Sequence, residues 1–144
     1  MTAFLNNQVI KWNETEYRVL ATLKGDVALC EMDDSRNLSI SYVPESTLTQ
    51  AKKDGKLQDI EDRYLSLRLR RPTGKSKEKA EEGYKLIEPI ISCPEAIFFK
   101  KLRSSLIAAA SNGDKVLRRK IYRTLGIYYR RGQAPGALNP PYVK

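Results

Sequence analysis

The stretch from Lys101 to Gly132, KLRSSLIAAASNGDKVLRRKIYRTLGIYYRRG, decides the fold of the second half of this chain. Apolar residues recur in it at helical spacing on both sides of Asn112 and Gly113, a pair typical of the end of a helix. Together with the apolar periodicity just upstream, this spacing predicts three helices, the last two joined by a short turn as in a helix-turn-helix. The predicted helices cover about residues 78–91, 96–111 and 114–131.

The second predicted helix carries an apolar stripe along one face. Its members are spaced by three, four and three residues, which is the spacing of neighbours along one side of an α-helix. We therefore expect this stripe to face the core of the helical part. The four positions are Phe99, Leu102, Leu106 and Ala109.

The third predicted helix separates apolar from basic side chains when it is drawn at about 100° per residue. One narrow sector holds the residues expected to face the core, which are Leu117, Ile121, Leu125 and Tyr128. The opposite side holds Arg119, Arg123, Gly126 and Arg130. Three guanidinium groups on a face turned away from the core form a row that suits the major groove of DNA.

We assign Arg119 and Arg123 in this row, together with Tyr122 on its shoulder, to contacts with base edges. Gly126 permits close approach of the DNA backbone, although a single exposed glycine is also tolerated without any function. The other basic residues of this helix are expected to hold phosphates or to line a groove. They are Lys115, Arg118, Lys120, Arg130 and Arg131.

The first part of the chain, residues 1–71, is typical of a small β domain. Short segments rich in Val, Ile, Leu and Tyr alternate with turn residues at a spacing of about ten residues. This pattern predicts an antiparallel meander curled into a small barrel, with the apolar residues between 57 and 69 closing the sheet. A short helix ended by Gly55 is expected after Pro44. The fold class is therefore α+β, a small antiparallel β-barrel or meander followed by a three-helix helix-turn-helix domain. The predicted strands are residues 8–12, 17–23, 27–32 and 38–43.

Two segments without regular structure complete the predicted organisation. Residues 72–77 are polar and contain a proline and a glycine, which predicts a linker to the helical domain of residues 78–132. Residues 133–144 contain three prolines and are expected to be extended. Such a tail, led by arginines, either follows a minor groove or is a plain linker.

Positive charge is concentrated in the second part of the chain. The net charge is +9; residues 1–60 hold 7 basic against 9 acidic side chains, whereas residues 61–144 hold 19 against 8. A basic surface of this size favours a polyanion, because each phosphate contact releases condensed counterions. A basic amphipathic helix also suits a membrane surface or an acidic protein. The alternative that stays open is therefore a protein–protein interaction module with a basic helical surface.

The composition argues against an enzyme. The chain has no histidine, the commonest general base and metal ligand, and its two cysteines, Cys30 and Cys93, are too few for a zinc site. We expect packed, reduced thiols, no catalytic or metal-binding residue, and no cofactor. No apolar run is long enough to cross a membrane and no export signal opens the chain, so we expect an intracellular protein without a membrane partner.

Several segments also resemble one family, in the order in which that family shows them. They are EYRVLA at residues 16–21, DGKL at 54–57, YKLIEPIIS at 84–92, the stretch 101–132 and QAPGALNPPY at 133–142, with RRGQAPGAL at 130–138 the most specific. Over most of its length the chain thus resembles the N-terminal DNA-binding region of TnsB-like transposases. One departure is Leu117, which stands where such helices often have a serine or threonine cap.

The resemblance implies sequence-specific binding of double-stranded DNA at the repeats of transposon ends, together with other transposition proteins, in the bacterial cytoplasm near the nucleoid. In that family, a separate RNase H-like domain with three metal-binding acidic residues joins the 3′ ends to target DNA. That domain lies downstream of the region matched by this chain. The resemblance therefore implies an N-terminal fragment that recognises transposon ends and has no catalytic residue of its own.

Overall fold

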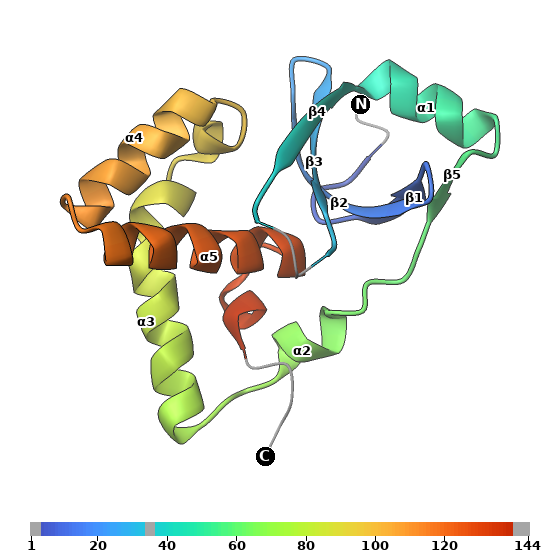
Figure 1. The fold of residues 1–144 in the computed structure, drawn as a ribbon. Helices are drawn as coiled ribbons and strands as arrows, with labels where there is room; N and C mark the ends of the chain where they lie inside the picture. The colour runs from blue at the N-terminus through green and yellow to red at the C-terminus, as the bar shows by residue number, and fades with distance from the viewer. Residues whose placement is uncertain (1–3, 34–36, 140–144) are drawn as a thin grey trace.

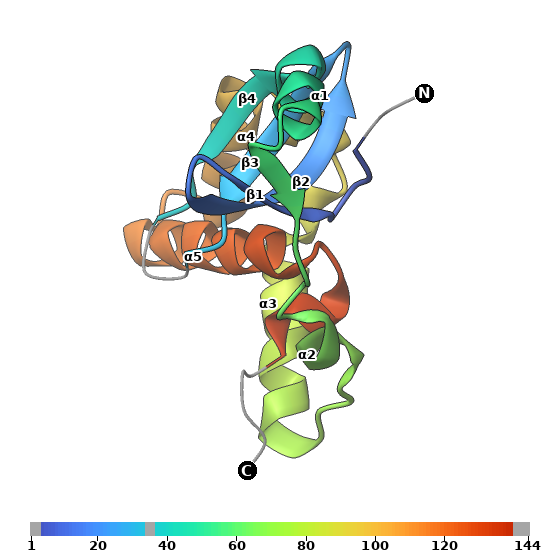
Figure 2. The ribbon, with the colours of Figure 1, turned by 90° about the vertical axis from the view of Figure 1, so that its right-hand side faces the viewer.

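A computed structural model describes residues 4–33 and 37–139 of the chain and shows the α+β class expected from the sequence. A sheet and a short helix form from residues 9–59, and the rest of the described chain is mainly helical (Figure 1). Helix α5 (Lys115–Arg131) runs between these two parts, and its C-terminal end lies beneath the sheet in both Figure 1 and Figure 2.

The sheet is an antiparallel meander that stays open. Its strands are β1 (Val9–Trp12), β2 (Thr15–Leu23), β3 (Asp26–Glu31), β4 (Ile40–Pro44) and β5 (Leu57–Asp59). The spatial order is β4-β3-β2-β1-β5, so β1 to β4 pair in succession and β5 returns to pair with β1. Within the described residues β4 and β5 form the two edges and do not pair with each other. The expectation of a closed barrel is therefore wrong, because the segment expected to close the sheet contributes only three residues.

Each face of the sheet packs against helices, because successive side chains of a strand point to opposite faces. Helix α1 (Glu45–Lys53) covers one face and buries Leu48 and Ala51 in a cluster with Val19 and Leu29. The other face belongs to a second cluster, which also contains side chains of the later helices. Its buried members from the strands are Leu20, Ala28 and Cys30.

The segment after β5 forms a short helix instead of a further strand. Helix α2 (Leu65–Leu69) buries Leu67, while Leu65 and Leu69 at its two ends are 51% and 73% exposed. The alternating leucines therefore do not line one face of a sheet, as the sequence suggested. Leu67 and the neighbouring Tyr64 instead pack with Val9 and Met32 in a small third cluster.

Three longer helices follow close to the predicted positions. They are α3 (Gly74–Ile91), α4 (Lys100–Ser111) and α5 (Lys115–Arg131), with a 3-10 helix η1 (Pro94–Ile97) before α4. Residues 74–77, expected in a linker, already belong to α3. The helical periodicity of the sequence thus identified the helices, while their first residues differ by a few positions.

The buried face of α4 is not the expected one. Phe99 and Leu102 are 53% and 36% exposed, and Phe99 precedes the helix as its N-cap. Arg103 is turned inward instead, because its Nη1 donates to the carbonyl oxygens of Ala96 and Ile97 at 2.8 and 3.2 Å. These hydrogen bonds offset the cost of burying a guanidinium group. The residues buried on α4 are Arg103, Ile107 and Ser111.

One cluster of buried side chains joins the sheet to the helices. It contains Leu20 and Cys30 from the strands together with Ile87 of α3, Ile107 of α4 and Ile121 of α5. Each of these five side chains is at most 1% exposed. The division into a β domain of residues 1–71 and a helical domain of residues 78–132 stays a prediction about how the two parts unfold.

The chain after α5 turns back onto the molecule. A 3-10 helix, η2 (Pro135–Leu138), contacts α2, α3 and α5 and buries Ala137 completely. Asn139 follows, and its Nδ2 donates to the carbonyl oxygens of Leu67 and Arg70 at 2.9 and 3.0 Å. The expected extended course thus does not hold for residues 135–138, because small residues there allow close packing. The last five residues of the predicted tail, 140–144, lie outside the described part of the chain.

Candidate nucleic-acid interface

The turn between α4 and α5 has the geometry of a tight helix–helix connection. Asn112 ends α4 in the left-handed conformation, with φ 52° and ψ 38°, and Gly113 follows with φ +82°. Asp114 then caps α5, because its Oδ1 accepts hydrogen bonds from the amides of Val116 and Leu117 at 2.9 and 3.2 Å. The missing serine or threonine cap is therefore replaced by an aspartate three residues before Leu117.

The first half of α5 presents a continuous basic surface, which we call the basic face. Its five side chains are all exposed, and α5 has no acidic residue along its whole length. The sequence therefore placed these cations correctly at the solvent side of the helix. The basic face consists of Lys115, Arg118, Arg119, Lys120 and Arg123.

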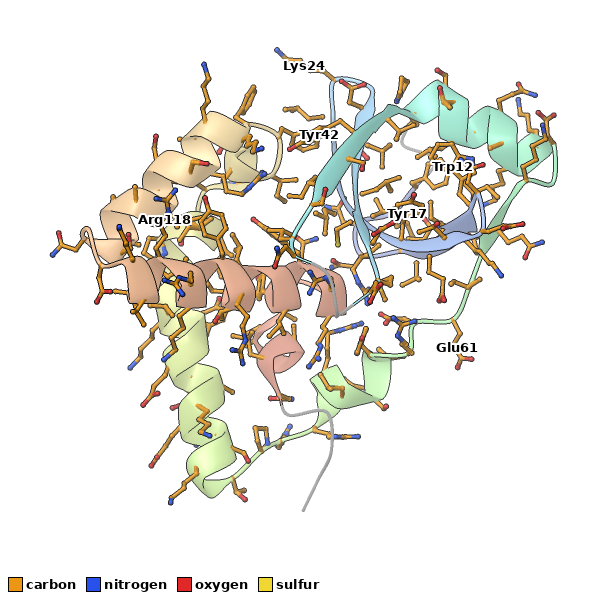
Figure 3. All side chains as sticks on the ribbon, in the orientation of Figure 1. Trp12, Tyr17, Lys24, Tyr42, Glu61 and Arg118 are labelled. Atoms are coloured by element: carbon orange, nitrogen blue, oxygen red, sulfur yellow. The ribbon has the colours of Figure 1, made fainter. Side chains whose placement is uncertain are left out.

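Figure 3 shows Arg118 on the part of α5 that extends beyond the sheet. Its guanidinium carbon lies 5.9 Å from the centre of the Tyr122 ring, a cation–π contact one turn along the helix. A hydrogen bond with the Ser104 side chain lowers the pKa of Tyr122, and Arg118 adds to this effect, while partial burial opposes it. Tyr122 is thus half-buried and held between α4 and Arg118, so it is less free to reach outward than the arginines are.

Two residues expected on the solvent side of α5 are buried. Gly126 faces the connection between β3 and β4, where a Cβ atom would lie 3.4 Å from the Cβ of Leu38. Arg130 is 5% exposed and its guanidinium lies against Gly126. The helical wheel was right about their angular position and wrong about exposure, because the sheet covers this side of α5 in its second half.

Arg131, the last residue of α5, also lies within the fold. Its guanidinium carbon is 5.2 Å from the centre of the Tyr64 ring, and its carbonyl oxygen accepts a hydrogen bond of 2.8 Å from Nη1 of Arg68. Neither Arg130 nor Arg131 therefore extends the basic face. The residues of the predicted site therefore form two groups. The first is the exposed cations of the basic face, and the second is Gly126, Arg130 and Arg131, which pack the end of α5 against the rest of the fold.

An ion pair between a buried arginine and a partly buried aspartate, which sequence reasoning did not find, fixes the end of α5 to the sheet. Arg18 on β2 is 0% exposed and pairs with Asp62 through two hydrogen bonds of 2.9 and 2.8 Å. The Nε of Arg18 donates to the carbonyl oxygen of Arg130, and Arg68 donates to both Asp62 and the carbonyl oxygen of Arg131. Two guanidinium groups thus satisfy the last carbonyl oxygens of a helix, where positive charge is favourable. We call this network the Arg18–Asp62 joint.

The surroundings of Asp62 determine its protonation state. Burial disfavours its charged form and would raise its pKa, but hydrogen bonds from Arg18, the Tyr64 amide and Arg68 outweigh burial. The pKa of Asp62 is therefore well below its usual range, and the carboxylate is ionised wherever the protein is folded near neutral pH. The only sequence signal for this network was an arginine within the apolar strand EYRVLA.

Residues 4–33 and 37–139 form neither a metal-ligand group nor a membrane-spanning helix. No three His, Cys, Asp or Glu side chains in these ranges come together in a group that could hold a metal ion. None of the helices in the same ranges combines the length and apolar character that crossing a membrane requires. Cys30 is buried, which raises the pKa of its thiol to about 12, and Cys93 is half-buried; both are free thiols.

Comparison with known proteins places these features in a family context. Residues 80–142 match the family model described as the TnsB second domain, a range that includes α4, α5 and η2. Over 138 residues the chain is 33% identical to a protein of Escherichia coli, Transposon Tn7 transposition protein TnsB. This similarity covers 94% of the chain, which spans 19% of the length of that relative.

Proposed function

Because this chain is similar to a TnsB transposition protein over 94% of its length, we propose that it binds double-stranded DNA sequence-specifically, at the ends of a transposon. The observation that carries the proposal is the basic face, with five exposed cations between Lys115 and Arg123 and no acidic side chain on the same helix. Helices α3, α4 and α5 then act as a helix-turn-helix, with α5 as the helix that enters the major groove.

Arg119 and Arg123 are the residues that read bases in this proposal. They lie one helical turn apart on the exposed side of α5, so both can reach the edges of neighbouring base pairs. An arginine can donate two hydrogen bonds to the O6 and N7 atoms of guanine, which distinguishes guanine from the other bases. Tyr122 supports them from the side, because its contact with Arg118 orients the neighbouring cation.

The other members of the basic face hold the phosphate backbone. Lys115 stands at the first position of α5, and Arg118 and Lys120 flank the base-reading residues. Such contacts fix the position of the helix in the groove without distinguishing sequences. Gly126, Arg130 and Arg131 serve the packing of α5 in this proposal, which the burial of Gly126 and Arg130 and the contacts of Arg131 with Tyr64 and Arg68 support.

Binding to a selected duplex tests the proposal. Duplexes of about 20 base pairs are selected from a random pool by the chain, and binding is followed by fluorescence anisotropy. We expect Arg119→Ala and Arg123→Ala each to relax discrimination at one base pair by about 1–3 kcal/mol. Lys120→Ala should weaken matched and mismatched duplexes alike and reduce the slope of log K against log salt by about one.

Lys11→Ala, which removes an exposed cation from β1, is the matched control and should leave both quantities unchanged. If both arginine variants weakened every sequence equally, these side chains would hold phosphate and the base-reading assignment would be lost. Affinity that does not depend on salt would contradict DNA binding through the basic face and favour the alternative, an interaction module for proteins. Protection of end repeats by the chain in a footprint tests the transposon-end part of the proposal.

A further inference from the structure

A groove lies between α3, the α2–α3 connection and η2. Its volume is about 560 Å³, within the range of about 300–1,000 Å³ that is usual for ligand sites. The connection leads directly into α3, whereas η2 comes from a distant part of the sequence, and the three segments meet below α5 in Figures 1 and 2. The residues around the groove are Arg68, Arg70, Arg71, Pro72, Lys77, Ala80, Glu81, Tyr84, Lys85, Glu88, Pro135, Gly136 and Asn139.

Close packing on one side gives the groove a firm wall. A Cβ atom on Gly136 would overlap the backbone of Arg68, at 2.8 Å from its carbonyl carbon, so only glycine fits there. Asn139 fixes the same wall through its two hydrogen bonds to the α2 segment. The opposite wall contains Tyr84, whose ring meets the ring of Tyr128 on α5 edge-on at 6.3 Å. Contacts within the chain therefore hold both walls of the groove in place.

The groove combines apolar surface with an excess of positive charge. Pro72, Ala80, Tyr84 and Pro135 supply the apolar surface. Five cationic residues border the groove against two carboxylates, Glu81 and Glu88. One of the five, Arg68, is engaged with Asp62 and a carbonyl oxygen, so it belongs to the Arg18–Asp62 joint. The exposed cations at the rim are Arg71, Lys77 and Lys85.

The groove and the basic face lie on different sides of α5. Thr124 and Tyr128 face α3, since a Cβ on Gly83 would lie 3.4 Å from Thr124 and since Tyr128 meets Tyr84. Each of these two residues follows an arginine of the basic face by five positions, which is a rotation of about 140° on a helix. A molecule in the groove therefore leaves Arg119 and Arg123 accessible.

We propose that this groove binds an acidic, apolar segment of a partner protein. Apolar side chains of the segment lie on Ala80, Tyr84 and Pro72, and its carboxylates approach Arg71 and Lys77. Charge complementarity selects such a segment, because the rim is basic while the interior is apolar. Duplex DNA fits less well, since a phosphate backbone cannot cover the apolar surface and meets two carboxylates, Glu81 and Glu88.

Peptide display tests the proposal with the whole chain. A library of random peptides about twelve residues long is selected on the protein, and the enriched peptide is synthesised with and without its carboxylates. We expect apolar residues next to Asp or Glu, and amide shifts in NMR spectra at Ala80, Tyr84 and Gly136. The double variant Arg71→Glu, Lys77→Glu should weaken binding about tenfold or more, since it reverses both charges.

Lys79→Glu provides the matched control, because Lys79 is exposed on the same half of α3 and does not border the groove. It should leave peptide affinity within about twofold of the unchanged protein. Peptide binding is expected whether or not the DNA proposal holds; where DNA does bind to the basic face, the peptide should leave its affinity unchanged.

Four results would overturn the proposal. The first is a selection that enriches basic peptides, or that enriches no peptide able to shift the amide signals of groove residues. The second is a shift of the Lys77 and Tyr84 signals when DNA is added, and the third is a dimer that the Arg71→Glu, Lys77→Glu variant abolishes. The fourth is peptide binding that appears only after removal of residues 140–144.

Discussion

The Nε of Arg18, on β2, donates a hydrogen bond of 2.8 Å to the carbonyl oxygen of Arg130 in the last turn of α5. The same guanidinium group holds Asp62, and Asp62 also holds Arg68, which reaches the next carbonyl oxygen of the helix. Strand, loop and helix end thus meet at one partly buried carboxylate. This joint fixes the direction in which the basic face projects beside the sheet.

Replacement of Arg18 by methionine should destabilise the fold strongly. Arg18→Met keeps an unbranched side chain but leaves the Asp62 carboxylate and the Arg130 carbonyl oxygen without this donor. We expect the free energy of unfolding, measured by urea denaturation, to fall by about 3–5 kcal/mol. The control is Lys52→Met, which removes a surface ion pair to Asp59 with both side chains about half exposed, and which should cost less than about 1 kcal/mol. Equal losses in the two variants would contradict the structural role of the buried pair.

Asp62 predicts a dependence of stability on pH in the acid range. Its pKa is lower in the folded state than in the unfolded chain, where an aspartate has a pKa of about 3.9. Its stabilising contribution is therefore complete above that value and is lost as the pH falls toward the folded-state pKa. Asp62→Asn should lower the free energy of unfolding at neutral pH. It should also make the loss of stability between about pH 5 and about pH 2 less steep, as measured by urea midpoints across this range. Asp59→Asn, at an exposed position, should leave the slope nearly unchanged; a similar flattening there would remove the assignment to Asp62.

Two glycines should respond to alanine in opposite ways. At Gly136 a Cβ atom would overlap the Arg68 backbone, so Gly136→Ala should push η2 away from α2 and cost about 1–3 kcal/mol. At Gly83, inside α3, a Cβ atom would meet Leu138 and Thr124 at 3.4 Å, while the helix gains up to about 1 kcal/mol from alanine. Thermal unfolding of both variants checks the expectation, and a neutral Gly136→Ala would show that η2 is not packed as described.

An aspartate at position 121 should loosen the sheet as well as the helices. Ile121 is completely buried in the cluster that includes Leu20, Ala28 and Cys30 of the strands. Ile121→Asp places an unpaired charge there, and loss of α5 would expose one face of the sheet. We expect amide protons of β2 and β3 to lose protection from hydrogen exchange together with those of α5. Protection kept in the strands would support two separately folding domains, as the sequence pattern predicts.

The sequence predicted the elements better than their contacts. The helices and the first four strands were found because periodicities of 3.6 and 2 are local properties of the chain, and short family motifs correctly identified the TnsB-like character. The alternating leucines of α2 were wrongly predicted to close the sheet, because three residues at a period of 2 do not distinguish a strand from a short exposed helix. For η2, the prolines predicted an extended chain, although proline also suits the first position of a 3-10 helix.

The candidate site was predictable only in its first half. Exposure of Arg119 and Arg123 followed from their position opposite Leu117 and Ile121 on the helical wheel. The same reasoning failed for Arg130, because a wheel describes one helix and does not include the sheet that covers it. The Arg18–Asp62 joint could not be predicted from local sequence patterns for a similar reason, since Arg18 and Asp62 are 44 positions apart in the sequence.

Because Gly126 contacts Leu38, the side of α5 that is exposed at positions 119 and 123 is packed against the protein at position 126. This difference determines which of these positions can change independently as related chains diverge. Substitutions at positions 119 and 123 change only what the helix meets outside the molecule. A larger residue at 126 must displace Leu38, so it requires a compensating change in the connection between β3 and β4. Relatives that acquire a new target are thus expected to differ at positions 119 and 123, whereas position 126 is expected to change only together with the residues of the sheet side that it contacts.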